Sequence, residues 1–169
     1  MLLPIPDRSV GTRSTSQAPY QAACPARINE LEKSSSSMQL TRAADYGVRV
    51  MIYLAGLPDN ERAMLPSLAV ATGAPPSFLS KVLQALSRAG LIASRRGQSG
   101  GFQIVSLGRQ ASIRNVIEAI DGPITLNLCL VNGESCSRKS WCPAHPVWAR
   151  AQQAMLQVLD TAMIADLAL

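Results

Sequence analysis

The chain has 169 residues, of which 47% are hydrophobic and only 4% aromatic, and its formal net charge is +5. This length and composition allow one ordinary domain with an aliphatic core, and no segment has the roughly 20 apolar residues of a membrane span. The N-terminal residues also lack the apolar core of a signal peptide, because Pro4, Pro6, Asp7 and Arg8 interrupt them. This favours a cytoplasmic protein with no membrane partner.

Residues 1–37 are rich in proline, serine and threonine and have no periodic apolar face, which predicts a disordered N-terminal extension. Cys24 lies in this segment, far from the other cysteines, and is predicted to be a free thiol. Met38 opens the strongly patterned part of the chain and is one candidate for its natural start.

Residues 38–122 have the pattern of a winged helix-turn-helix domain. Thr41 can cap a helix that runs to about Ala55. Leu65 opens a second helix, which Gly73 is expected to end. Short helices joined by a small turn that contains glycine are typical of the helix-turn-helix motif.

A third helix is predicted from Phe78 to Arg88. One face is expected to pack inward and consists of Phe78, Val82, Leu83 and Leu86. The opposite face carries Ser77, Ser80, Lys81 and Gln84. Hydroxyl, ammonium and amide groups suit base edges and phosphates, so this helix is predicted to enter a major groove of DNA.

Two strand-like segments, 91–94 and 102–105, flank a glycine-rich tip that carries Arg95 and Arg96. This pattern predicts a wing whose arginines enter a minor groove or clamp phosphates. From Lys81 to Arg114 the sequence has six basic residues and no acidic one, which favours a polyanion such as DNA. An ordinary basic hairpin on a helical protein is the alternative.

Ser112 is expected to cap a helix from Ile113 to Ile120 that completes this domain. The last element, roughly Pro146 to Leu167, is predicted to be one long helix. Its apolar stripe is close to heptad spacing and cannot be covered by one small domain, so residues 146–169 are predicted to form a dimerisation helix. The alternative is a helix that packs back on its own domain.

Residues 123–145 are predicted to form a cysteine-rich loop. It contains Cys129, Cys136 and Cys142, and the chain's single histidine, His145, follows one helical turn later. Thiolates and imidazole bind zinc and iron–sulfur clusters. Structural zinc sites usually contain tight cysteine pairs, which are absent here, so the wide spacing favours an iron–sulfur cluster, either 4Fe–4S or 2Fe–2S. No Cys-x-x-Cys pair or nucleophile–base arrangement points to an enzyme.

Several segments resemble the Rrf-type family of winged-helix transcriptional regulators, which includes iron–sulfur regulators of the IscR and NsrR type. The similar segments are 38–49, 86–92, 96–102, 116–122 and 142–148. The resemblance covers residues 38–169. It implies a homodimer that holds one iron–sulfur cluster per subunit and binds a palindromic operator in double-stranded DNA.

By the same resemblance, Cys129, Cys136 and Cys142 are cluster ligands. The fourth ligand is either His145 or, from the first helix of the other subunit, Asp45. The resemblance also implies DNA contacts at Ser77, Ser80, Lys81 and Arg96. The full predicted DNA-binding set is Thr41, Arg42, Ser77, Ser80, Lys81, Gln84, Arg95 and Arg96.

We therefore predict a mainly α-helical fold, with a small β-hairpin wing and a long C-terminal dimerisation helix. The predicted function is that of a DNA-binding transcriptional repressor that senses nitric oxide, redox state or iron–sulfur status through a cysteine-ligated cluster. The alternative is a zinc-stabilised winged-helix DNA-binding protein without a sensing cluster. Neither prediction is an enzyme.

Overall fold

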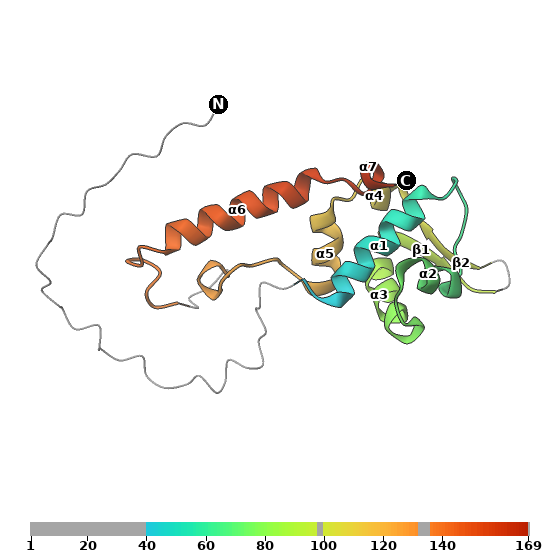
Figure 1. The fold of residues 1–169 in the computed structure, drawn as a ribbon, viewed down its shortest axis with the longest axis horizontal. Helices are drawn as coiled ribbons and strands as arrows, with labels where there is room; N and C mark the ends of the chain where they lie inside the picture. The colour runs from blue at the N-terminus through green and yellow to red at the C-terminus, as the bar shows by residue number, and fades with distance from the viewer. Residues whose placement is uncertain (1–39, 98–99, 132–135, 169) are drawn as a thin grey trace, which may run out of the picture. The chain divides into compact units, whose positions relative to one another are not determined.

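The computed structural model describes residues 40–97, 100–131 and 136–168, which form a mainly helical fold with one two-stranded antiparallel sheet (Figure 1). Its elements are α1 (Arg42–Gly56), α2 (Leu65–Thr72), α3 (Pro76–Arg88), β1 (Ile92–Arg95), β2 (Gly101–Ile104), α4 (Ser106–Arg109), α5 (Ile113–Asp121), the 3-10 helix η2 (Leu128–Leu130), α6 (His145–Thr161) and α7 (Ile164–Leu167). The predicted fold class is confirmed. The predicted extension over residues 1–37, with Cys24, lies outside the described residues.

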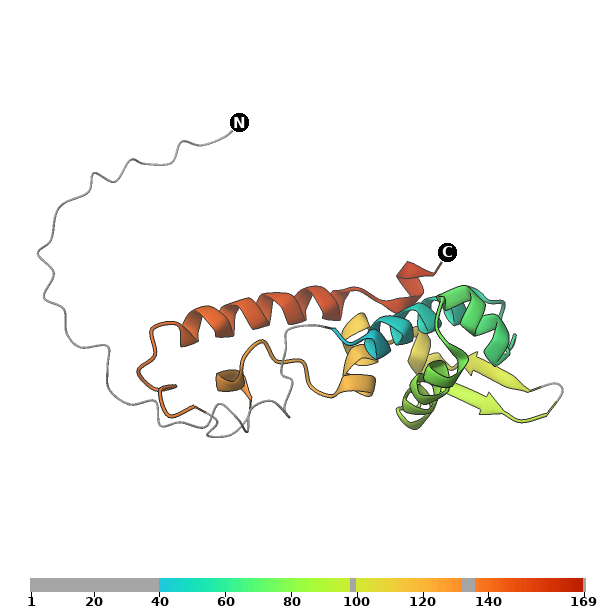
Figure 2. The same cartoon turned by 60° about the horizontal axis from the view of Figure 1, so that its bottom comes forward.

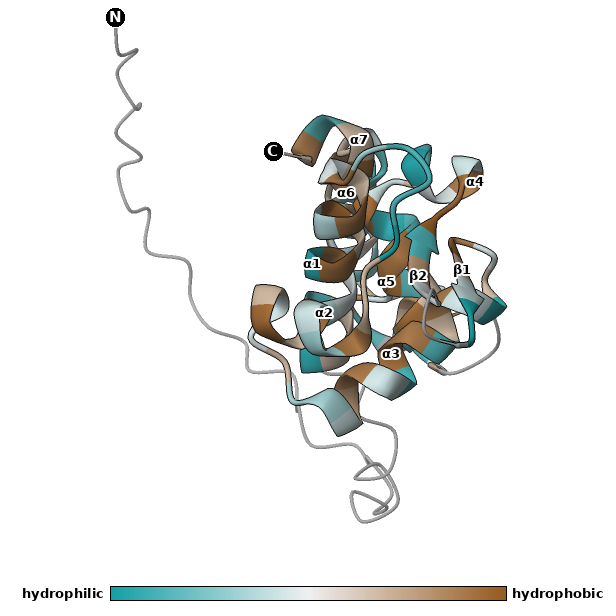
Figure 3. Ribbon diagram, turned by 90° about the vertical axis from the view of Figure 1, so that its right-hand side faces the viewer, coloured by the Kyte–Doolittle hydropathy of each residue, from teal (hydrophilic) through white to brown (hydrophobic). Residues whose placement is uncertain are grey.

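The core is aliphatic, as the low aromatic content predicts. Its largest fully buried side chains are Met51, Leu54, Leu68, Leu79, Leu83, Leu86, Ile117 and Ile164. Figure 3 shows hydrophobic stretches, in brown, where α1, α3 and α5 pack together. Burial stabilises the fold by about 1.5–3 kcal/mol for each such side chain. No helix in the described ranges is long and apolar enough to cross a membrane.

Local signals set the ends of the first three helices. Thr41 caps α1, and its Oγ1 accepts a hydrogen bond from the amide of Ala44 at 3.1 Å. Gly73 ends α2 with a φ of 68°, a left-handed conformation that glycine adopts without strain. A proline lies in the first turn of both α2 and α3, where its missing amide hydrogen is not needed. The three predicted helices are confirmed.

The inward face of α3 differs from the prediction by one residue. Its buried residues are Leu79, Val82, Leu83 and Leu86. These follow the helical period, whereas Phe78 lies about 90° from the centre of this face and is 38% exposed. The ring of Phe78 instead packs edge-on against Tyr46 of α1, with 5.8 Å between the ring centroids.

The predicted wing is a hairpin of β1 and β2, although residues 98–99 at its tip lie outside the described ranges. The strands are antiparallel, and Arg95 pairs with Gly101 at their outer end. Ala63 forms a further bridge to Phe102 through two backbone hydrogen bonds of 2.9 Å. Since β2 is held by β1 on one side and by Ala63 on the other, the base of the wing is fixed to the domain.

The C-terminal helix is shorter than predicted, because α6 ends at Thr161 rather than near residue 167. The amide of Ile113 donates to the carbonyl of Ala162 at 2.9 Å, and the amide of Ile164 donates to the carbonyl of Ala111 at 2.9 Å. Ile164 is fully buried in the core. This backbone pairing and the burial of Ile164 interrupt the helix and produce the separate α7.

We expect Gly108→Ala to destabilise the domain, because α4 lies directly against the start of β1. A Cβ at Gly108 would collide with the carbonyl oxygen of Leu91 and would lie 2.9 Å from Cγ1 of Ile104. Backbone cannot yield as a side-chain end can, so the free energy of unfolding should fall by about 1–3 kcal/mol or more. Urea unfolding followed by circular dichroism measures the change. The exposed Ser106→Ala in the same helix is the control, and equal stability of the two variants would contradict this packing.

Candidate DNA interface and cysteine loop

The polar face of α3 is open to solvent. Ser77, Lys81 and Gln84 are exposed. The Ser80 hydroxyl is half-buried and donates to the carbonyl of Pro76 at 3.0 Å. Lys81 and Gln84 thus present an ammonium and an amide outward, the groups that contact phosphates and base edges in a major groove.

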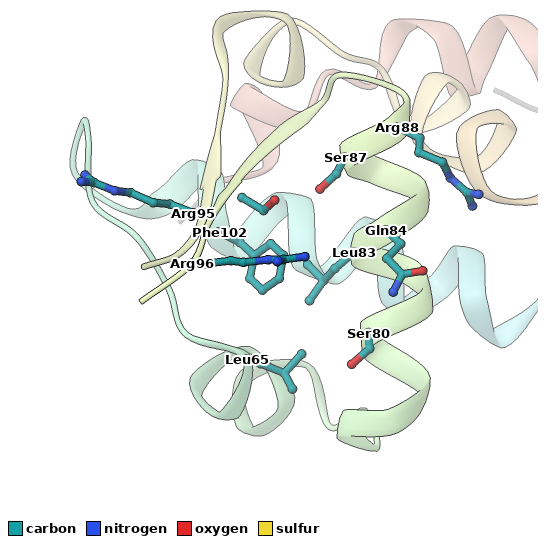
Figure 4. A pocket seen from close by; sticks show the side chains of 10 residues that line it. Leu65, Ser80, Leu83, Gln84, Ser87, Arg88, Arg95, Arg96 and Phe102 are labelled. Carbon is teal, nitrogen blue, oxygen red and sulfur yellow. The ribbon is translucent and has the colours of Figure 1, made fainter. Parts of the chain in front are cut away.

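A groove of about 530 Å³ runs between α3 and the wing (Figure 4). Its lining residues are Leu65, Ser80, Leu83, Gln84, Ser87, Arg88, Ser94, Arg95, Arg96 and Phe102. In Figure 4, Arg96 reaches across the groove toward α3, whereas the side chain of Arg95 points away from α3. The groove brings together four of the predicted DNA-binding residues, which are Ser80, Gln84, Arg95 and Arg96.

The lining of this groove has three arginines and no acidic residue. A groove whose charged side chains are all positive has a positive electrostatic potential, which favours binding of an anionic DNA strand. The hydroxyl oxygen of Ser87 is buried beside it and has no hydrogen-bond partner among the described residues. Because buried polar groups are normally satisfied, a phosphate oxygen or a bridging water in the groove would complete the hydrogen bonding of Ser87.

Arg88 is a groove residue that the sequence-based prediction missed. From the sequence alone it counts only toward the basic stretch. It follows Lys81 by seven positions and Gln84 by four, so the helical period places all three on one side of α3. That spacing was sufficient to identify it.

Thr41 and Arg42, also predicted to contact DNA, do not line the groove. The Thr41 hydroxyl donates to the carboxylate of Asp121, whose two oxygens lie 2.8 and 2.9 Å away. This contact ties the start of α1 to the end of α5. Arg42 is exposed in the first turn of α1. DNA contact by these two residues stays a prediction.

Two of the six basic residues between Lys81 and Arg114 have partners within the fold. Arg109 pairs with Asp59 at 3.0 Å. Arg114 pairs with Glu118 of α5 at 3.0 Å and with Asp160 of α6 at 2.9 Å. The other four side chains, on α3 and the wing, are exposed and available to DNA.

The three loop cysteines are half-buried and form no disulfide among the described residues. Cys129 lies in η2, Cys136 opens a turn, and Cys142 precedes α6. The amide of His145 donates to the carbonyl of Cys142 at 3.2 Å, so a turn joins these two residues, which do not share one helical face. Within the described ranges, no three side chains of His, Cys, Asp or Glu lie close enough to hold a metal ion together.

The two candidates for a fourth ligand have different surroundings. Nε2 of His145 is buried and has no hydrogen-bond partner among the described residues. Asp45 instead forms an ion pair with Arg49, one turn along α1, at 2.8 Å. Three free thiols and an imidazole nitrogen without a partner fit the donor chemistry of an iron–sulfur cluster or of zinc, although the structure does not gather them into one site.

Comparison with known proteins identifies the fold and the family. Residues 40–169 match the Rrf2 family, described as iron-dependent transcriptional regulators. CymR, the global cysteine regulator of B. subtilis, is 28% identical, with a TM-score of 0.62 over 77% of this chain and 95% of CymR. CymR of Staphylococcus aureus is 29% identical, with a TM-score of 0.61 over 76% of this chain and 96% of that one.

IscR of T. potens shares the fold at 23% identity, with a TM-score of 0.60 over 76% of this chain and 84% of that one. The match to the family extends across the helix-turn-helix, the wing, the cysteine loop and α6. A transcriptional regulator of this kind binds DNA and is not an enzyme. The chain belongs to the Rrf2 family of transcriptional regulators.

Proposed function

We propose that this protein is a repressor whose affinity for a palindromic operator depends on an iron–sulfur cluster held by Cys129, Cys136 and Cys142. The observation that carries the proposal is the set of free donors on one segment, three half-buried thiols and the orphaned Nε2 of His145. His145 is favoured over Asp45 as the fourth ligand, because Asp45 already has a cationic partner. When bound, the cluster supplies a centre that nitric oxide or oxidants alter.

The cysteine loop is connected through α5 to the helices of the proposed DNA-binding domain. The loop leaves α5 after Asp121, and it leads into α6 at His145. The backbone amide of Leu126 donates to Oε1 of Gln152 in α6 at 3.0 Å. A change in how the cysteines are held therefore displaces the first half of α6 relative to α5, and α5 packs on α1 and α3.

A homodimer through α6 is part of this proposal. None of the helix's 17 residues is buried within the chain. Val147, Trp148 and Val158 are 52%, 43% and 67% exposed. A helix with this much apolar surface is stabilised when a second copy covers it. Two copies related by a twofold axis present two α3 helices, which match the two half-sites of a palindrome.

The test is to purify the protein without oxygen, and then to measure its visible absorption, its iron, sulfide and zinc content, and its sedimentation. We expect a brown dimer with iron and acid-labile sulfide, whose operator affinity changes when nitric oxide is added. A colourless protein with about one zinc per chain would indicate a structural metal in place of the sensing cluster. Equal operator affinity with and without the cluster would overturn the sensing role.

A further inference from the structure

The C-terminal end of α6 is anchored to the DNA-binding domain, and the helix extends from there toward the cysteine loop (Figure 2). There the backbone of Ala162 and Ile164 is hydrogen-bonded to Ile113 and Ala111 at the start of α5, and Ile164 is fully buried. Farther toward its start, α6 contacts η2 and the segment around Leu126, which belong to the cysteine loop. A backbone anchor beyond the end of a helix fixes the position of that end, whereas side-chain contacts on the helix itself restrict its direction.

One side chain of the DNA-binding domain makes such a contact. Arg114 of α5 donates through Nε to Oε1 of Glu118 at 3.0 Å, and through one terminal nitrogen to Oδ2 of Asp160 in α6 at 2.9 Å. These hydrogen bonds, that of Glu118 first and that of Asp160 next, raise the pKa of the Arg114 guanidinium. Glu118 fixes the orientation of the guanidinium on α5, and Asp160, in the last turn of α6, accepts its second hydrogen bond.

We propose that the Arg114–Asp160 ion pair sets the angle between α6 and the DNA-binding domain, and thereby the half-site spacing that the protein accepts in its operator. This inference rests on the proposed function, because it requires dimerisation through α6. With α6 fixed at the dimer interface, its angle to the domain determines the separation and rotation of the two α3 helices. Half-site spacing follows from that geometry.

The ion pair can be removed without removing the anchor. Asp160 is 46% and Arg114 is 32% exposed in the side chain, so neither is part of the aliphatic core. In an Asp160→Asn variant, the backbone pairing of Ala162 and the burial of Ile164 are retained, and the domain should fold. Arg114 and Asp160 act by positioning α3, and neither lines the groove beside it.

The experiment uses duplexes selected from a random library by the wild-type protein, with the spacer between half-sites then lengthened or shortened by one base pair. Wild-type protein should lose affinity by about tenfold or more on either change, because one base pair rotates a half-site by about a tenth of a turn. Asp160→Asn should bind the three spacers within about threefold of one another, since its α6 direction is not fixed. Asp166→Asn is the matched control, because it removes an exposed carboxylate from α7 but leaves the Arg114–Asp160 contact in place, and it should keep the wild-type spacer preference.

Asp160→Glu keeps the carboxylate and should restore the wild-type preference, which a loss of stability alone would not explain. A spacer profile of Asp160→Asn equal to that of the wild type would overturn the inference and leave the proposed dimer intact. If the wild type instead binds a single half-site as tightly as the palindrome, dimerisation through α6 fails, and the inference fails with it. Urea unfolding of each variant establishes that the compared proteins are folded.

Discussion

Arg96→Ala is expected to weaken operator binding by roughly 5- to 150-fold, which corresponds to about 1–3 kcal/mol. The reason is the direction of its side chain. Arg96 extends from the wing across the groove toward α3, so its guanidinium lies where a DNA strand bound between the wing and α3 would pass (Figure 4). A guanidinium has five N–H donors, so it can form two hydrogen bonds at once to a base edge or a phosphate.

Arg95→Ala is the matched control, since it removes the same charge from the adjacent residue, whose side chain points away from α3. It should reduce the dependence of log Kd on log salt by about one unit and leave base preference unchanged, as expected for one lost phosphate contact. Titrations at several salt concentrations, with the operator and with a scrambled duplex, measure both effects. Equal losses for the two variants would contradict the special role of the Arg96 side chain.

Much of the DNA-binding domain could be predicted from the sequence because its signals are local. Thr41, Gly73 and the two prolines define helix ends within a few residues of themselves. The glycine-rich tip between two strand-like segments likewise identifies a hairpin. These elements are consecutive in the chain, so two predicted residues of α3, Ser80 and Gln84, meet the two wing arginines in one groove once the helices pack.

The features that the sequence did not predict depend on contacts between distant residues. α6 stops at Thr161 because the following residues pair with the segment near Ile113, almost fifty positions earlier. In the sequence, Arg114 is one more residue of a basic stretch. Its ion pair with Asp160 is visible only in the structure. Neither partner is recognisable from spacing, since no helical or strand period connects them.

The metal-binding site of the cysteine loop could be predicted from the sequence only in part. Residue types and spacing give the donor chemistry, and the structure supports it with free thiols and an unsatisfied His145 nitrogen. The described residues do not bring these donors together into one metal-binding site. Ligation couples the folding of a metal-binding loop to the bound group, so the arrangement of such a loop is not set by the chain alone.

Cys142→Ala is expected to abolish the visible absorption and most of the bound iron, while the DNA-binding domain stays folded. Cys142 is half-buried and lies in the segment before α6, outside the aliphatic cluster around α1, α3 and α5. Its loss removes one thiolate of the proposed cluster without opening a cavity in that core. Anaerobic spectra, iron analysis and circular dichroism measure the three properties.

Cys24→Ala is the matched control for this substitution, because the sequence separates Cys24 from the other cysteines by more than a hundred residues. It should retain the full absorption. Loss of helical signal in Cys142→Ala would instead indicate a structural metal, since removing a ligand of such a site removes folding free energy. His145→Ala and Asp45→Asn then separate the two fourth-ligand candidates. We expect His145→Ala to make the cluster labile and Asp45→Asn to leave it unchanged, because Nε2 of His145 lacks a partner whereas Asp45 is already paired with Arg49.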